Sequence, residues 1–162
     1  MKEPDEARKL ALEYFQQAYE KQMQGELDQA VELYKQSIEV WPTAEAHTFL
    51  GWTYSFRGRL DEAIEECHKA IAVDPDFGNP YNDIGAYLVQ QGRYDDAIPW
   101  LQRAMEAKRY EARAYPHMNL GRVWEYKGRI NDAMQEYRKA LAEAPDYAEA
   151  YKALKRLESR LN

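Results

Sequence analysis

The apolar residues of this chain recur at helical spacing, in segments separated by short polar turns. Within each segment they stand three or four residues apart, which places them on one face of a helix. Two of the clearest stripes are Leu27, Val31, Tyr34 and Ile38, and Leu60, Ile64, Cys67 and Ile71. We therefore predict a chain of amphipathic helices whose apolar faces pack together in a core.

A glycine recurs at the same place in each predicted pair of helices. These turn glycines are Gly25, Gly58, Gly92 and Gly128, at spacings of 33, 34 and 36 residues. A residue just past a helix end often needs φ above zero, and glycine adopts that conformation at the least cost. An internal period of this length predicts a repeated pair of helices, each pair joined by a glycine-capped turn.

A second set of glycines lies inside helices, seven residues before a turn glycine. Its members are Gly51, Gly85 and Gly121. An interior glycine costs a helix about 1 kcal/mol relative to alanine, so a gain elsewhere must offset it. We predict that these glycines, facing alanines such as Ala63 and Ala97, let the two helices of a unit approach closely.

The period divides the chain into one predicted domain of four helix-turn-helix units and a capping helix. The units are expected at about 11–43, 44–77, 78–113 and 114–147, and the cap at about 148–161. Pro42, Pro75 and Pro145 close three units, whereas the third has Arg109 at that place and two extra residues. We expect the lengthened junction at 107–113 to be the weakest interface of the array.

The repeated pattern resembles the tetratricopeptide repeat (TPR) family. In the second unit its motif reads His47, Leu50-Gly51, Tyr54, Ala63, Cys67, Ala70, Pro75, and in the fourth His117, Leu120-Gly121, Trp124, Ala133, Tyr137, Ala140, Pro145. The resemblance implies an all-α, right-handed α-solenoid whose first helices line a concave groove. It also implies a non-enzymatic protein-protein interaction scaffold that binds a partner peptide or helix in this groove.

Charge and cysteine content narrow the classes of partner. The formal net charge of -6 repels a phosphate backbone, and the one basic cluster, Lys108, Arg109 and Arg113, is short, so we expect no nucleic-acid binding. A single cysteine excludes an intrachain disulfide and fits a reducing compartment. No apolar run reaches the length of a membrane span. We expect no membrane partner and a cytoplasmic protein.

The residues able to carry out chemistry are few. Cys67 lies in a predicted core stripe, and His68, the next residue, points about 100° away around the helix, so the two form no nucleophile-base pair. His47 and His117 occupy bulky packing positions of the repeat. We predict no catalytic residues, no metal site and no cofactor.

The inner faces of the first helices carry the candidate binding residues. Those predicted to bind the partner are Phe15, Tyr19, Phe49, Trp52, Phe56, Asn79, Asn82, Tyr115, Met118, Asn119, Arg122 and Tyr126. Rings supply contact area, and asparagine both donates to and accepts from a peptide backbone. The other interpretation is that about half of these rings only pack on neighbouring helices. Near Arg122, Lys152 and Arg156, an acidic group of the partner should be favoured modestly.

Two further expectations concern the kind of partner. Related repeats that hold the acidic tails of heat-shock chaperones need Lys, Asn and Arg at five inner positions, and here these hold Phe15, Tyr19, Phe49, Asn79 and Asp83, so that role is not expected. Alternatively, the chain is a self-associating structural module, possible as a homodimer, through an end face that includes Leu10, Leu12, Phe15 and Tyr19.

Overall fold

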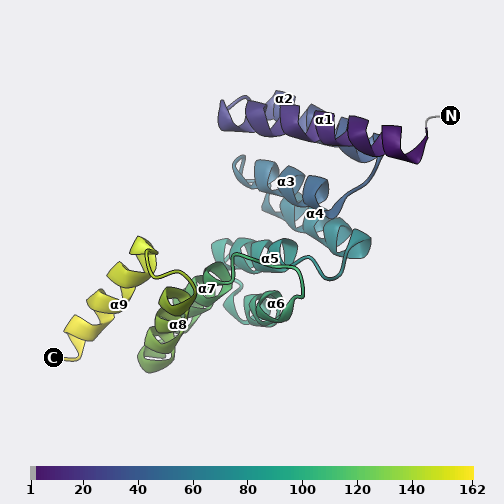
Figure 1. Cartoon of the computed structure of the whole chain (residues 1–162). Coiled ribbons are helices and arrows are strands. Elements are labelled where there is room, and N and C mark those ends of the chain that lie inside the picture. The colour runs from purple at the N-terminus through teal and green to yellow at the C-terminus, as the bar shows by residue number, and fades with distance from the viewer. Residues whose placement is uncertain (1–2) are drawn as a thin grey trace.

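The computed structural model describes residues 3–162, which form nine α-helices and no β-strand (Figure 1). The helices are α1 (Pro4–Met23), α2 (Leu27–Val40), α3 (Ala44–Ser55), α4 (Leu60–Val73), α5 (Asn79–Gln90), α6 (Tyr94–Glu106), α7 (Ala114–Tyr126), α8 (Ile130–Glu143) and α9 (Ala148–Arg160). The all-α prediction is confirmed.

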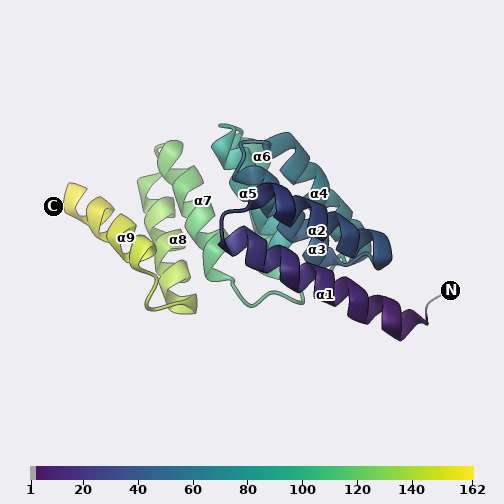
Figure 2. The same ribbon diagram turned by 90° about the horizontal axis from the view of Figure 1, so that it is seen from above.

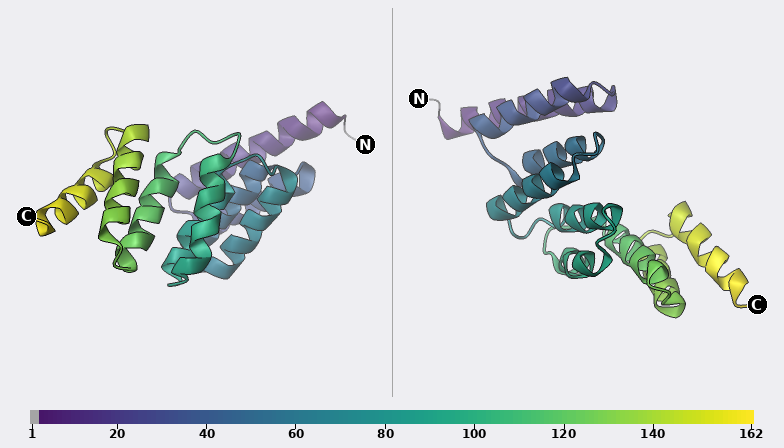
Figure 3. Two further views of the ribbon diagram at one scale, coloured as in Figure 1. Left: turned by 90° about the horizontal axis from the view of Figure 1, so that it is seen from below. Right: turned by 180° about the vertical axis from the view of Figure 1, so that it is seen from behind.

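The helices pack as consecutive pairs that stack into a curved array. Each odd-numbered helix packs on the even-numbered helix that follows it, and each pair contacts the next (Figures 1 and 2). The direction of the pairs turns progressively along the array, which leaves the two ends of the chain far apart (Figure 3). Helix α3 also contacts α5, and α5 contacts α7, so these odd-numbered helices lie side by side along the inner side of this helical-repeat solenoid.

The four turn glycines cap the first helix of each pair, as predicted. Their φ angles are 78°, 73°, 77° and 76° for Gly25, Gly58, Gly92 and Gly128. After each glycine, the next amide donates back to a carbonyl of the last helical turn, for example Arg59 N to Tyr54 O at 3.1 Å. The glycine turn therefore also sets the position at which each second helix begins.

Polar side chains connect each turn to the turn of the next pair. The acidic residue near the start of one second helix contacts the side chain directly before the next turn glycine. These pairs are Asp28 with Arg57, Asp61 with Gln91, and Asp95 with Lys127. All three pairs are exposed, so each contributes little to stability. The same contact nevertheless recurs at the same position between successive repeats.

The interior glycines lie where two helices nearly touch. A Cβ atom added to Gly51 would stand 2.8 Å from the backbone oxygen of Ala63, while one added to Gly85 would stand 2.4 Å from Cδ2 of Leu101. The first obstacle is rigid backbone, and the second is the fully buried side chain of Leu101, whose Cγ would also lie 2.6 Å away. The predicted close approach of the helices is present at both glycines.

The lengthened connection at 107–113 is held against the preceding loop. Gly78 N donates to Arg109 O at 3.0 Å, and Arg109 N donates to Asp76 O at 2.9 Å. The Arg109 guanidinium reaches Glu45 at 2.8 Å and Asp74 at 2.7 Å. These bonds tie the connection to the loop between the second and third units and to the start of α3. The weakness of the interface between the third and fourth units stays a prediction.

Gly51→Ala should destabilise the protein despite the higher helix propensity of alanine. We expect the free energy of unfolding to fall by about 1 to 3 kcal/mol, because the Ala63 carbonyl cannot move without shifting α4. Gly85→Ala is the matched comparison and should also cost stability, because Leu101, whose Cδ2 and Cγ would lie 2.4 and 2.6 Å from the new Cβ, is fully buried and must repack. Urea unfolding of both variants measures the difference, and a Gly51→Ala variant as stable as the parent would contradict it.

Hydrogen exchange should find the connection protected at two defined amides. We expect the amides of Gly78 and Arg109 to exchange as slowly as those near the ends of α4 and α5, because both are bonded across the two loops. Lys108 and Glu111, which make no backbone bond of this kind, are the internal controls and should exchange faster. Equal, fast exchange at all four amides would show that the bonds between the two loops do not hold the connection.

Candidate functional site

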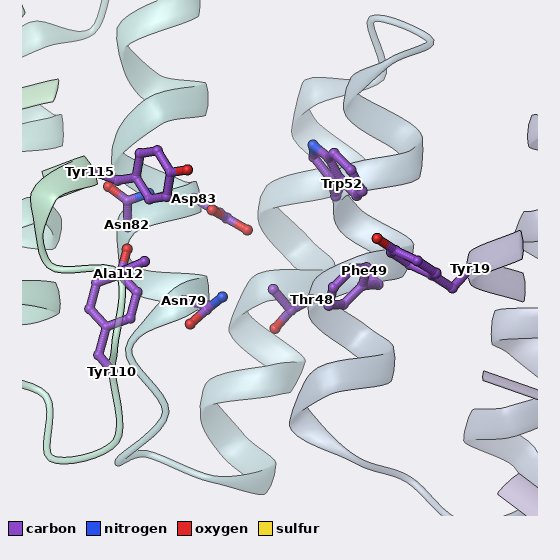
Figure 4. Close-up of a pocket in the computed structure, with 10 residues that line it drawn as sticks. All are labelled: Tyr19, Thr48, Phe49, Trp52, Asn79, Asn82, Asp83, Tyr110, Ala112 and Tyr115. Carbon is purple, nitrogen blue, oxygen red and sulfur yellow. The ribbon is translucent and has the colours of Figure 1, made fainter. Parts of the chain in front are cut away.

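A pocket of about 530 Å³ opens on the inner side of the array (Figure 4). Helices α1, α3, α5 and α7 and the connection at 107–113 contribute its walls. Half of the predicted binding residues line it, namely Tyr19, Phe49, Trp52, Asn79, Asn82 and Tyr115. The other lining residues are Thr48, Asp83, Tyr110 and Ala112.

One wall of the pocket is a cluster of aromatic rings around Phe49. Its ring centroid lies 5.2 Å from that of Phe15, 5.9 Å from Tyr19 and 5.8 Å from Trp52. Trp52 in turn lies 4.9 Å from Phe56. Tyr19 remains 42% exposed, so this wall offers accessible ring surface that is held in place by neighbouring rings.

The opposite wall comes from α7 and from the connection before it. Tyr115 is 51% exposed and meets Tyr147 edge to face at 5.6 Å. Tyr110 is buried and packs directly on Gly78, where an added Cβ would stand 2.4 Å from the tyrosine Cβ. Sequence reasoning did not find Tyr110 or Ala112 as lining residues; the two extra residues at this junction predicted only a lengthened connection.

The predicted asparagines hydrogen-bond to each other. Asn119 Nδ2 donates to Asn82 Oδ1 at 3.0 Å, and Arg122 donates to Asn119 Oδ1 at 3.1 Å. Arg122 also reaches Glu149 at 3.1 Å. Asn82 is buried, whereas its partner Asn119 is half-buried, so these amides hold α5 and α7 together at the edge of the pocket.

Two of the three cations at the basic end of the groove are paired with carboxylates. Arg156 makes a two-point contact with Glu125, at 2.9 and 2.8 Å, and Arg122 is paired with Glu149. Lys152 makes no such ion pair among the described residues, so cations still outnumber carboxylates here and the modest preference for an acidic group stays a prediction.

The remaining predicted residues lie outside the pocket. Phe15 packs between Phe49 and Tyr34, and Met118 is buried in the core formed by α7, α8 and α9. Phe56 extends the ring cluster beyond the pocket, and Tyr126 is 73% exposed and stacks on Tyr94 at 4.4 Å. Phe15 and Met118 are thus positioned as packing residues, which matches the other interpretation for part of the set.

Asp83 is the charged group of the pocket. Its carboxylate projects into the space between α3 and Tyr115 (Figure 4). Within residues 3–162 it makes no ion pair with any Lys, Arg or His. Burial raises the pKa of Asp83 from 3.8 to about 7, and the neighbouring Asn82 amide opposes the shift only in part.

The surroundings of Cys67, His47 and His117 suit a structural role. Cys67 is fully buried, and burial raises the pKa of its thiol well above the usual range. His47 Nδ1 shares a hydrogen bond of 2.8 Å with Glu66, and His117 Nδ1 shares one of 2.7 Å with Glu136, at the same place in two repeats. In the part of the chain that the structure describes, no three His, Cys, Asp or Glu side chains gather as metal ligands.

None of the helices described combines the length and apolar character needed to cross a membrane.

The fold and its inner pocket define a helical-repeat protein, and sequence comparison gives the family. Models of the tetratricopeptide repeat match residues 15–76, 57–118 and 114–147. The chain belongs to the tetratricopeptide repeat family, and the resemblance drawn from its repeated motif is confirmed.

Relatives of known name match parts of this chain. It is 30% identical over 142 residues to the type IV pilus assembly protein PilF of Pseudomonas aeruginosa, covering 85% of this chain and 54% of that protein. It is 32% identical over 78 residues to the small glutamine-rich tetratricopeptide repeat-containing protein 2 of Mycosarcoma maydis, covering 48% of this chain and 22% of that protein. The chain thus spans about half of the first relative and about a fifth of the second.

Solved structures show the same arrangement of helices. The structure of P. aeruginosa PilF matches with a TM-score of 0.86 and 26% identity, covering 96% of this chain and 69% of that chain. A crystal structure of MamA matches with a TM-score of 0.72 and 26% identity, covering 88% and 82% of the two chains.

Asp83→Asn should stabilise the protein at neutral and alkaline pH. The folded carboxyl, with a pKa of about 7, holds its proton up to a higher pH than the unfolded one at 3.8, so folding becomes less favourable as pH rises between these values. Asparagine cannot ionise and removes that loss. Because solvent reaches the carboxylate through the pocket, we expect a gain of about 1 to 3 kcal/mol near pH 8.

The same variant supplies its own control at low pH. Near pH 4 the folded Asp83 is protonated, and the difference in unfolding free energy between parent and variant should shrink toward zero. Chemical unfolding at several pH values measures both differences. A gain in unfolding free energy that did not depend on pH would show that ionisation of Asp83 is not its cause.

Proposed function

We propose that this chain is a non-enzymatic protein-interaction scaffold that binds a partner peptide in the inner groove of its repeats. Tetratricopeptide repeats in general mediate protein-protein interactions. The observation that carries the proposal is the pocket of about 530 Å³, because its lining consists of accessible rings, amides and one carboxylate rather than an assembly of reactive groups.

The shape of the pocket supports an extended segment as the ligand. Trp52 and Tyr19 lie on one side and Tyr115 on the other, with Asn79 between them (Figure 4). Rings on both sides can enclose a side chain of the peptide, while the Asn79 amide can pair with its backbone. The cytoplasmic location stays a prediction.

Self-association through the first helix remains the alternative. Leu12 of α1 is 55% exposed and supports it, whereas Phe15 and Tyr19 both contact Phe49 of α3. Leu12→Asp is therefore the variant that tests this face, since Phe15→Asp would disturb packing between helices. Sedimentation over a concentration series separates the two functions: a dimer that Leu12→Asp dissociates would favour the alternative.

Tyr115→Ala tests the groove with little risk to the fold. We expect peptides selected from a random library to bind this variant about tenfold or more weakly, because an exposed ring forms one wall of the pocket. The melting temperature should change little, since Tyr115 is 51% exposed. Tyr151→Ala, which removes a ring of similar exposure (54%) on α9, is the matched control and should bind as the parent does.

The result decides whether the groove is the binding surface. Equal binding by Tyr115→Ala, Trp52→Ala and the parent would place the selected peptides elsewhere. A parent chain that enriched no peptide at all would remove the support for a peptide-binding groove.

A further inference from the structure

The carboxylate of Asp83 stands among groups that suit a positively charged ligand. It projects into the pocket between the exposed ring of Tyr115 and the face of α3 that carries Trp52 (Figure 4). Aromatic faces attract a cation, and a partly desolvated carboxylate attracts it more strongly than a surface one does. No cation among the described side chains occupies this place, since the ion pairs of residues 3–162 do not include Asp83.

A second hollow of about 420 Å³ adjoins the first and is acidic. The two share Ala112 and Tyr115 as lining residues. Among the residues of the second hollow are Glu111, Glu143 and Asp146, and none of them is paired with a Lys, Arg or His of the described chain. Negative charge therefore continues from the pocket along the surface toward the start of α9.

Two cations on the elements that line this track make contacts of their own. Arg113 donates to the carbonyl oxygens of Met105 and Ala107, and Arg122 is held by Asn119 and Glu149. The chain as a whole has a formal net charge of -6, which adds to the attraction for a basic partner at long range.

We propose that the partner is a basic peptide segment whose Lys or Arg side chain enters the pocket and pairs with Asp83 between Trp52 and Tyr115. This inference rests on the proposed function, and it adds the chemical class of the ligand. A second basic residue of the segment would lie over Glu111, Glu143 and Asp146. The unfavourable burial of the Asp83 carboxylate would then be offset when the ligand arrives, because the cation restores a partner to the ionised form.

The test uses pools of short immobilised peptides that differ at one fixed central residue. That residue is Lys, Arg, Met, Gln or Glu, and the flanking positions are mixed. The wild-type chain should bind the Lys and Arg pools about tenfold more than the Glu pool and more than the Met and Gln pools. Asp83→Asn, which keeps the shape of the side chain, should bring this ratio close to one.

Asp76→Asn is the matched control. It removes the same charge from an exposed position outside the pocket, and it should keep the preference for basic pools. Binding of the Lys pool by the wild-type chain should also weaken as salt is added, because a charge pair at the pocket is screened.

The possible results separate this inference from the function on which it rests. Peptides that bind through Tyr115 without a preference for Lys or Arg, or with a preference for Glu, would overturn the basic ligand and leave the groove intact. A basic preference that survives Asp83→Asn would overturn the assignment to this pocket. A dimer that Asp83→Asn dissociates would make a second copy of the chain the occupant. If no pool binds, both proposals fail.

Discussion

The close approach of two helices inside each repeat is the constraint on which the rest of this structure depends. At Gly51 the backbone of α4 lies so near that an added Cβ would meet the Ala63 oxygen at 2.8 Å. Such contact fixes the angle and depth at which the pair packs, because neither backbone can be displaced by a rotamer change. The odd-numbered helices are then brought together on one side, and the pocket forms where their side chains meet.

A regular repeat alone would not have closed this pocket. The connection at 107–113 departs from the period, and its extra residues bring Tyr110 and Ala112 into the lining. Gly78 makes this possible, since any side chain there would collide with Tyr110. Bonds from Arg109 to Glu45 and Asp74 hold the connection in place, so an irregularity of the sequence becomes a rigid wall.

The sequence predicted the regular part of the molecule well because each signal acts locally. Glycines such as Gly58 and Gly92 specify a turn through their own φ, and the apolar stripes specify a helix face over two turns. The site was predicted less completely. Helical spacing placed Phe15, Phe49 and Trp52 on one side of the array, but it could not separate a ring packed between helices from one that faces a pocket. That distinction depends on the distance between helices and on the path of the connection, which involve residues far apart in the chain.

The role inferred for Asp83 changes once the side chains that surround it in the folded chain are known. In the sequence it only argued against a carboxylate ligand, because a like charge would be repelled. In the structure it is surrounded by rings and lacks a cationic partner among the described residues, so its ionised form is disfavoured and its pKa is raised to about 7. A partly buried, unpaired charge makes folding less favourable, and such groups are found most often at functional sites, where a ligand can supply the missing partner. In the function proposed for this groove, the feature that weakens the free fold is therefore the one that selects a basic ligand.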